Sequence, residues 1–163
     1  MNNPSVQAFA EEFEQTHGDR VHRVLMARLR AAPSALRAFG LEYPPGKTDI
    51  WGLLIFGARA LHFFVHASES SMSALFRTAM QGAPPKEQYA VFGPEQLADI
   101  QLPVKKNGLF RLFSRSADTI TVQALLPDRT KASFFFESVL DPGDLREHAA
   151  RLLAARPNQE NGQ

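Results

Sequence analysis

The chain has 163 residues, of which 44% are apolar and 21% are charged, and its formal net charge is +1. This length and composition predict about one globular domain with a substantial core. The near-neutral charge excludes a generally basic surface of the kind that coats nucleic acid, so we expect no nucleic-acid partner. Because the chain has no cysteine, disulfides, thiolate zinc sites and thiol nucleophiles are excluded as well.

The sequence shows no sign of a targeting or membrane-spanning segment. Its N-terminus has neither the basic start nor the apolar core of a signal peptide. The longest apolar stretch, residues 50–67, is interrupted by Arg59 and two histidines, which argues against a membrane span. We therefore expect a cytoplasmic protein without a transmembrane segment, either free or peripheral to a membrane.

Residues 1–42 are predicted to form an N-terminal extension of two helices. Apolar residues recur at helical spacing up to Phe13, and Gly18 is a suitable C-terminal stop. A second run at helical spacing covers Val21–Ala32, where Pro33 interrupts it. The apolar stripes of these helices require a cover, which is either the rest of the same chain or a second copy.

After a linker rich in proline and glycine at residues 43–47, the pattern is typical of β-structure. Over residues 50–67, periodicity alone does not separate a buried helix from two buried strands, but the glycine, β-branched and aromatic content favours strands. A short helix is expected to begin near Ser70. Phe134–Phe136 is so apolar that we expect its strand to pack on both faces. The predicted strands, in chain order, are Ile50–Phe56, Leu61–His66, Tyr89–Phe92, Leu97–Val104, Leu109–Ser114, Thr119–Leu126 and Lys131–Val139.

The chain is predicted to end in one amphipathic helix and a polar tail. Asp141 is the predicted cap, Pro142 stands where a missing N–H costs nothing, and Asp144 places a negative charge at the positive helix end. The apolar face of the helix begins at Leu145. Residues 157–163 are expected to be disordered.

Residues 102–115 form the densest basic and aromatic segment. Asn107-Gly108 supplies the positive φ angles of a type I′ hairpin turn. The functional interpretation is a surface for an anionic partner, such as a phospholipid headgroup or an acidic protein. The structural interpretation is a hairpin whose lysines keep the sheet edge soluble. The candidate ligand-binding residues are Lys105, Lys106, Arg111 and Arg115.

The order of these elements resembles the bacterial pleckstrin-homology-like (PH-like) domains over roughly residues 48–155. The resemblance implies a partly open antiparallel β-barrel with a C-terminal capping helix, in a family whose members bind lipids, peptides or proteins and often self-associate. We therefore expect an α+β protein with a helical extension (1–42), a PH-like domain (48–156) and a tail (157–163). The similar segments are Gly52–Phe64, Phe92–Leu102, Gly108–Arg115, Thr119–Val122 and Phe134–Phe136 followed by Asp141-Pro142.

No motif points to catalysis, a metal or a cofactor. His62 and His66 are four residues apart, which on a strand is roughly 13 Å and too far for one metal ion. The sequence has no Gly-x-Ser-x-Gly elbow, and Pro44–Thr48 ends in Gly-Lys-Thr without the upstream glycine of a phosphate loop. We therefore predict no catalytic residue, no metal ligand and no cofactor.

The function expected from the sequence is non-enzymatic binding or assembly through protein–protein contacts, including self-association into a homo-oligomer. A first alternative is peripheral binding of anionic phospholipid by the basic and aromatic hairpin at residues 105–115. A second alternative, which the sequence favours less, is an enzyme of unknown type.

Overall fold

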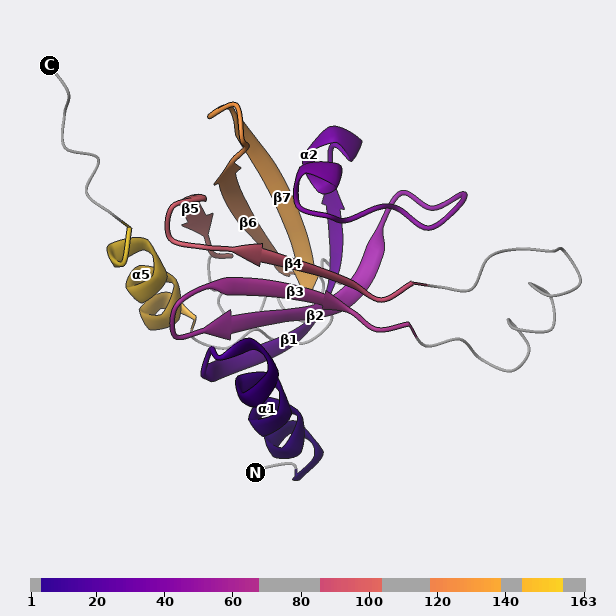
Figure 1. Cartoon of the computed structure of the whole chain (residues 1–163). Helices are drawn as coiled ribbons and strands as arrows, with labels where there is room; N and C mark the ends of the chain where they lie inside the picture. Colours follow the sequence, from indigo (N-terminus) through magenta and orange to yellow (C-terminus); the bar gives the residue numbers. More distant parts are fainter. Residues whose placement is uncertain (1–3, 68–85, 104–117, 139–144, 157–163) are drawn as a thin grey trace, which may run out of the picture.

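The structure is a computed structural model that describes residues 4–67, 86–103, 118–138 and 145–156 (Figure 1). Its strands join into one sheet and its helices flank that sheet, which confirms the predicted α+β class. The described elements, in chain order, are α1 (Pro4–His17), β1 (Val21–Ala31), α2 (Pro33–Ala38), β2 (Ile50–Gly57), β3 (Leu61–Val65), β4 (Gln88–Phe92), β5 (Leu97–Gln101), β6 (Asp118–Leu125), β7 (Lys131–Ser138) and α5 (Arg146–Ala154).

The sheet has seven strands in the order β4-β3-β2-β1-β7-β6-β5, and all neighbouring strands are antiparallel. The first strand therefore lies in the middle, while β4 and β5 form two edges that do not pair with each other. The sheet is accordingly open rather than closed into a full barrel. Helix α5 follows β7 and lies against β5, in agreement with the predicted C-terminal helix.

The second predicted N-terminal helix is wrong, because residues 21–31 form the central strand β1. Its buried residues Leu25, Ala27 and Leu29 alternate with outward residues, which is the period of a strand. The same apolar positions also fit a helical stripe over this short window, so the local pattern was ambiguous. Pairing with β2 on one side and β7 on the other satisfies the β1 backbone and decides the conformation. The sheet therefore includes a strand from the predicted helical extension.

The predicted strands that fall within the described residues are present, with ends that differ by a few residues. The largest difference is in β5, which ends at Gln101 and not at Val104. The predicted hairpin at 105–115, the helix expected near Ser70 and the cap at Asp141 lie outside the described residues.

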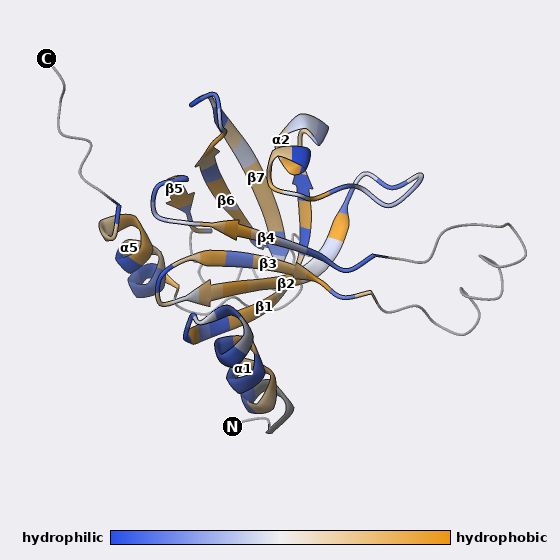
Figure 2. Cartoon of the chain, in the orientation of Figure 1, coloured by the Kyte–Doolittle hydropathy of each residue, from blue (hydrophilic) through white to orange (hydrophobic). Residues whose placement is uncertain are grey.

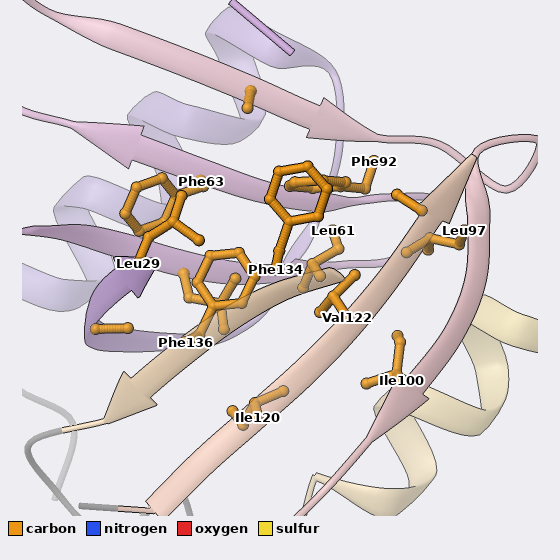
Figure 3. Packing of buried hydrophobic residues seen from close by; sticks show 14 of the residues in the cluster. Leu29, Leu61, Phe63, Phe92, Leu97, Ile100, Ile120, Val122, Phe134 and Phe136 are labelled. Carbon is orange, nitrogen blue, oxygen red and sulfur yellow. The ribbon is translucent and has the colours of Figure 1, made fainter. Parts of the chain in front are cut away.

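The inner face of the sheet carries a continuous aromatic and aliphatic core (Figure 3). Phe92 packs edge-on against Phe134 with ring centroids 5.0 Å apart, and Phe63 lies 5.3 Å from Phe136. Burying each such ring fully contributes roughly 1.5–3 kcal/mol of hydrophobic free energy. In Figure 2 hydrophobic colours predominate along the strands but are interrupted by polar residues, while α1 and α5 carry both polar and apolar residues.

The connection between β1 and β2 contributes to the same core. Leu36 from α2 and Leu41 just after it are buried, and Phe39 stacks on Phe92 with ring centroids 4.6 Å apart. Downstream, the Tyr43 hydroxyl donates to the Ala31 carbonyl at 2.6 Å and accepts from the Ala31 N–H at 2.9 Å. Side chains of this connection therefore pack into the core beside β4 and β7.

The Phe134–Phe136 run does not pack on both faces as predicted. Phe134 and Phe136 point inward and are fully buried, but Phe135 is 41% exposed on the outer face. Because successive strand residues alternate between the faces, a run of three phenylalanines leaves one ring outside whenever that face has no cover.

Candidate functional site

Helix α1 covers one part of the outer face of the sheet. The Phe13 ring meets the His62 ring edge-on at a centroid distance of 5.1 Å, and His17 lies 4.4 Å from the Tyr89 ring. Ile55, the outward residue of β2 that lies opposite His62 in the register, is fully buried. The first predicted helix is thus present and packs against its own chain.

A buried chain of polar groups lies under α1. Asp19, which is 3% exposed, accepts hydrogen bonds from the backbone N–H groups of Arg59 and Ala60, both at 3.0 Å. The same carboxylate lies 2.8 Å from His62 Nε2, and His62 Nδ1 lies 2.8 Å from the Tyr89 hydroxyl. A neutral His62 that carries its proton on Nε2 satisfies both contacts, because it donates to Asp19 and accepts from Tyr89.

The Asp19 carboxylate requires a glycine opposite it. A Cβ atom on Gly57 would lie 2.2 Å from Asp19 Oδ2 and 2.8 Å from the Ala60 carbonyl oxygen. Gly57 therefore lets the β2–β3 turn approach the carboxylate closely. Because Asp19 lies between α1 and β1, these contacts attach the start of β1 to the β2–β3 turn.

The Asp19–His62–Tyr89 chain has the residue types of a proton relay, but its electrostatics suit a structural connection. Burial, together with the Asp19 charge, raises the pKa of Tyr89 to about 12, so its phenol stays protonated at neutral pH. Burial also lowers the pKa of His62, with the hydrogen bond to Asp19 opposing that shift. Phe13 further covers the His62 ring. These groups fix the position of α1 and the β2–β3 turn.

A neighbouring part of the outer face is apolar and has no such cover. We call it the outer-face patch, and its strongly exposed members are Met26 (55%), Trp51 (50%) and Phe135 (41%). Met26 lies opposite Leu53 in the sheet register, and Leu53 lies opposite Phe64, so these side chains form one row across β1, β2 and β3. The patch consists of Met26, Trp51, Leu53, Phe64 and Phe135.

Arginines separate the aromatic side chains of the outer-face patch. Arg28 lies opposite Trp51, with its guanidinium carbon 5.9 Å from the ring centroid, and it also contacts Asp49 at 3.6 Å. Arg28 and Arg30 both bind the carboxylate of Glu137. The hydrogen bond from Arg28 lowers the pKa of Glu137 and raises that of Arg28, so both groups stay charged.

The candidate anion-binding residues predicted from the sequence, Lys105, Lys106, Arg111 and Arg115, lie outside the described residues. Of the two histidines considered as a metal pair, His62 is held by Asp19 and Tyr89, whereas His66 is exposed just after β3. Within the described part of the chain, no group of three or more histidine or acidic side chains is placed to hold a metal ion.

Sequence reasoning missed both features of the outer face. The contacts of Asp19 join it to partners about forty residues away in the chain, which no local pattern indicates. The outer-face patch was hidden by the helical interpretation of residues 21–32. The signal available in the sequence was the alternation of the apolar Ala27 and Leu29 with Arg28 and Arg30.

Comparisons with known proteins add little to this geometry. No protein-family model and no curated protein matches the chain. A crystal structure of the C-terminal domain of an unknown protein from Leishmania infantum is similar at 11% sequence identity, covering 92% of this chain and 94% of that one, with a TM-score of 0.39. A likeness at this level carries no argument about fold or function. Among the described helices, none is both long and apolar enough to cross a membrane.

Proposed function

We propose that the protein is a cytoplasmic, non-enzymatic binding or assembly module that acts through protein–protein contacts at the outer-face patch. The observation that carries this proposal is the exposure of Met26, Trp51 and Phe135 on one face of a rigid sheet. Large exposed apolar side chains interspersed with arginines, as Trp51 and Phe135 are with Arg28 and Arg30, are typical of protein interaction sites. The inner face supports a non-enzymatic role, since its volume is filled by apolar side chains.

We also propose that the sheet and its last helix form a PH-like domain. The support is the strand order, in which the first strand joins the two halves of an antiparallel sheet that stays open between β4 and β5. The position of α5 against β5 adds to it. In such an arrangement the outer face of the sheet can contact a partner, while the side chains of the inner face form the core.

The partner that we propose at the outer-face patch is a second copy of the chain. The patch carries both signs of charge, because Arg30 has a 53% exposed side chain on β1, while Asp49, the ion-pair partner of Arg28, lies just before β2. In a twofold arrangement the same surface meets itself, so cations of one copy can approach the anions of the other. Trp51 and Phe135 would then be buried together at the centre of the contact.

Light scattering over a concentration series tests this proposal. We expect the wild-type protein to dimerise with a Kd at or below about 1 mM. The variants Trp51→Glu and Phe135→Glu should be monomers with an unchanged circular dichroism spectrum. The matched control is Val91→Glu, because Val91 is an exposed apolar residue of β4 that lies outside the patch. A wild-type monomer throughout the series, or dimers in both patch variants, would contradict the proposal.

The second candidate function, peripheral binding of anionic phospholipid, rests on the four cations of residues 105–115. Sedimentation with anionic and neutral vesicles distinguishes it from self-association. Equal binding to both kinds of vesicle, or none to either, would argue against it.

A further inference from the structure

A groove of about 730 Å³ opens where four segments meet: α2, the β4–β5 turn, the β6–β7 turn and the end of α5. These segments are far apart in the sequence and surround the open side of the sheet (Figure 1). The groove shares no lining residue with the outer-face patch, so an inference about it is independent of the function proposed above. Its volume is in the range of sites for small molecules.

Apolar side chains form one part of the groove lining. Phe39, Leu125 and Leu126 line it together with Pro94 and Pro127. Phe39 is held in place by its stacking on Phe92 and by an edge contact with Phe134 at 5.2 Å. A ligand in the groove therefore meets a preformed apolar surface.

The groove is also lined by three cations and one carboxylate. The cations are Arg129, Lys131 and Arg156, and the carboxylate is that of Glu95. Elsewhere in the described residues, Arg28, Arg30, Arg59 and Arg151 have carboxylate partners. None of the ion pairs in the same residues involves the three cations of the groove. Arg156 is oriented by a hydrogen bond of 3.0 Å from its guanidinium to the Ala98 carbonyl.

The backbone at Arg129 provides a second observation. Its φ angle is +65°, in the left-handed region that favours glycine or asparagine. The turn is held by the hydrogen bond from Arg129 N to Leu126 O, and by Asp128, which accepts from the N–H and the hydroxyl of Thr130. An arginine thus occupies a position where glycine or asparagine would be less strained, and its side chain lines the groove.

From these observations we propose that the groove binds a small organic anion with an apolar part, of the class of phosphate monoesters. The net positive charge of the lining attracts the phosphate. The side chains of Phe39, Leu125 and Leu126 contact the apolar part of the ligand. Three cations are too few for a nucleic acid, which is bound through many phosphate contacts. The same chemistry is found in soluble phosphate monoesters and in lipid headgroups.

Titration with phenyl phosphate, followed by NMR of the backbone amides of Ala98, Arg129 and Lys131, tests the proposal. We expect saturable shifts with a Kd of about 1 mM, which is reasonable for about eleven non-hydrogen atoms. Inorganic phosphate, which lacks the apolar part, should bind more weakly, and neutral benzyl alcohol should bind hardly at all. The absence of saturation by phenyl phosphate up to about 20 mM, or equal binding of benzyl alcohol, would overturn the proposal.

Charge-removing variants locate the site. Lys131→Gln and Arg156→Gln should each weaken phenyl phosphate binding by about threefold to tenfold, as expected for loss of one partly screened cation. The matched control is Arg37→Gln, since Arg37 is an exposed cation of α2 that does not line the groove. Its affinity should equal that of the wild type. An equal loss in the control would show that only the general charge of the protein matters and would refute the site.

The source of the anion is distinguished by adding vesicles. Sedimentation with vesicles that contain a phosphate-monoester lipid, and loss of that sedimentation in the double variant Lys131→Gln/Arg156→Gln, would identify a lipid headgroup as the ligand. Phenyl phosphate binding without vesicle binding would identify a soluble monoester. Either result supports the groove as an anion site. The outcome of the self-association test at the outer-face patch does not affect this conclusion.

Discussion

At the residue scale, the Asp19 side chain is held in place by several buried contacts. Its carboxylate is buried, accepts two backbone hydrogen bonds and is paired with His62. A buried carboxylate is tolerated when its hydrogen bonds are complete, and the removal of its partners or of the carboxylate leaves other buried groups unsatisfied. Asp19 and its partners therefore make a large contribution to the packing of α1 and the β2–β3 turn.

We expect Asp19→Ala to lower the free energy of unfolding by about 2–4 kcal/mol, because the N–H groups of Arg59 and Ala60 and the His62 ring lose their acceptor. Urea denaturation measures the effect. Asp49→Ala is the control, since Asp49 forms a longer and partly exposed ion pair that is worth less than about 1 kcal/mol. Equal losses in the two variants would show that Asp19 is no more important than a surface carboxylate.

The pH dependence of stability should reflect His62. Burial lowers the pKa of His62 below its ordinary value of 6.5, so the unfolded chain takes up a proton at a higher pH than the folded protein. The stability is therefore complete above pH 6.5 and declines as the pH falls from there through the lowered pKa of the folded state. Urea midpoints between about pH 8 and pH 5 should show this decline in the wild type and a smaller one in His62→Gln. A decline of the same size in both would exclude His62 as its origin.

At the element scale, β2 shows how one glycine allows two strands to pack closely. A Cβ on Gly52 would lie 2.5 Å from the Phe64 carbonyl oxygen and 2.8 Å from the Phe63 ring. The sequence alone predicted this strand correctly from its apolar and β-branched residues, yet gave no reason for the glycine within it. The reason lies in the neighbouring strand β3, which approaches Gly52 closely.

We expect Gly52→Ala to destabilise the protein by about 1–3 kcal/mol, because the added methyl group meets backbone that cannot move without disturbing the β2–β3 pairing. Thermal unfolding followed by circular dichroism checks this. Thr121→Ala is a control for a small change at a half-buried strand position and should cost less than about 1 kcal/mol. A Gly52→Ala protein as stable as the wild type would mean that the two strands separate at little cost.

At the scale of the whole molecule, the two faces of the sheet have different roles. The inner face is filled by its own side chains and by Leu36, Phe39 and Leu41 from the β1–β2 connection. The outer face is covered by α1 over His62, and it is open at the outer-face patch. The covered and open parts are neighbours on the same strands, so a partner at the patch would continue the cover that α1 begins.

The sequence by itself determined the described β-strands after residue 50 and the helices α1 and α5. In strands such as β6, the apolar residues Ile120, Val122 and Ala124 alternate with polar residues. Such a short-range pattern can be recognised from neighbouring residues in the sequence alone. Residues typical of turns indicated where these strands begin and end. These features need no knowledge of distant contacts.

Only the tertiary structure decided the conformation of residues 21–31 and the arrangement of the outer face. The apolar spacing of β1 suits a helix and a strand alike, and pairing with β2 and β7 selects the strand because it satisfies the backbone on both sides. The Asp19–His62–Tyr89 chain joins residues up to 70 positions apart, and the exposure of Trp51 and Phe135 depends on which helices cover which face. Such long-range pairings leave no local periodicity, which is why they appear only in the folded chain.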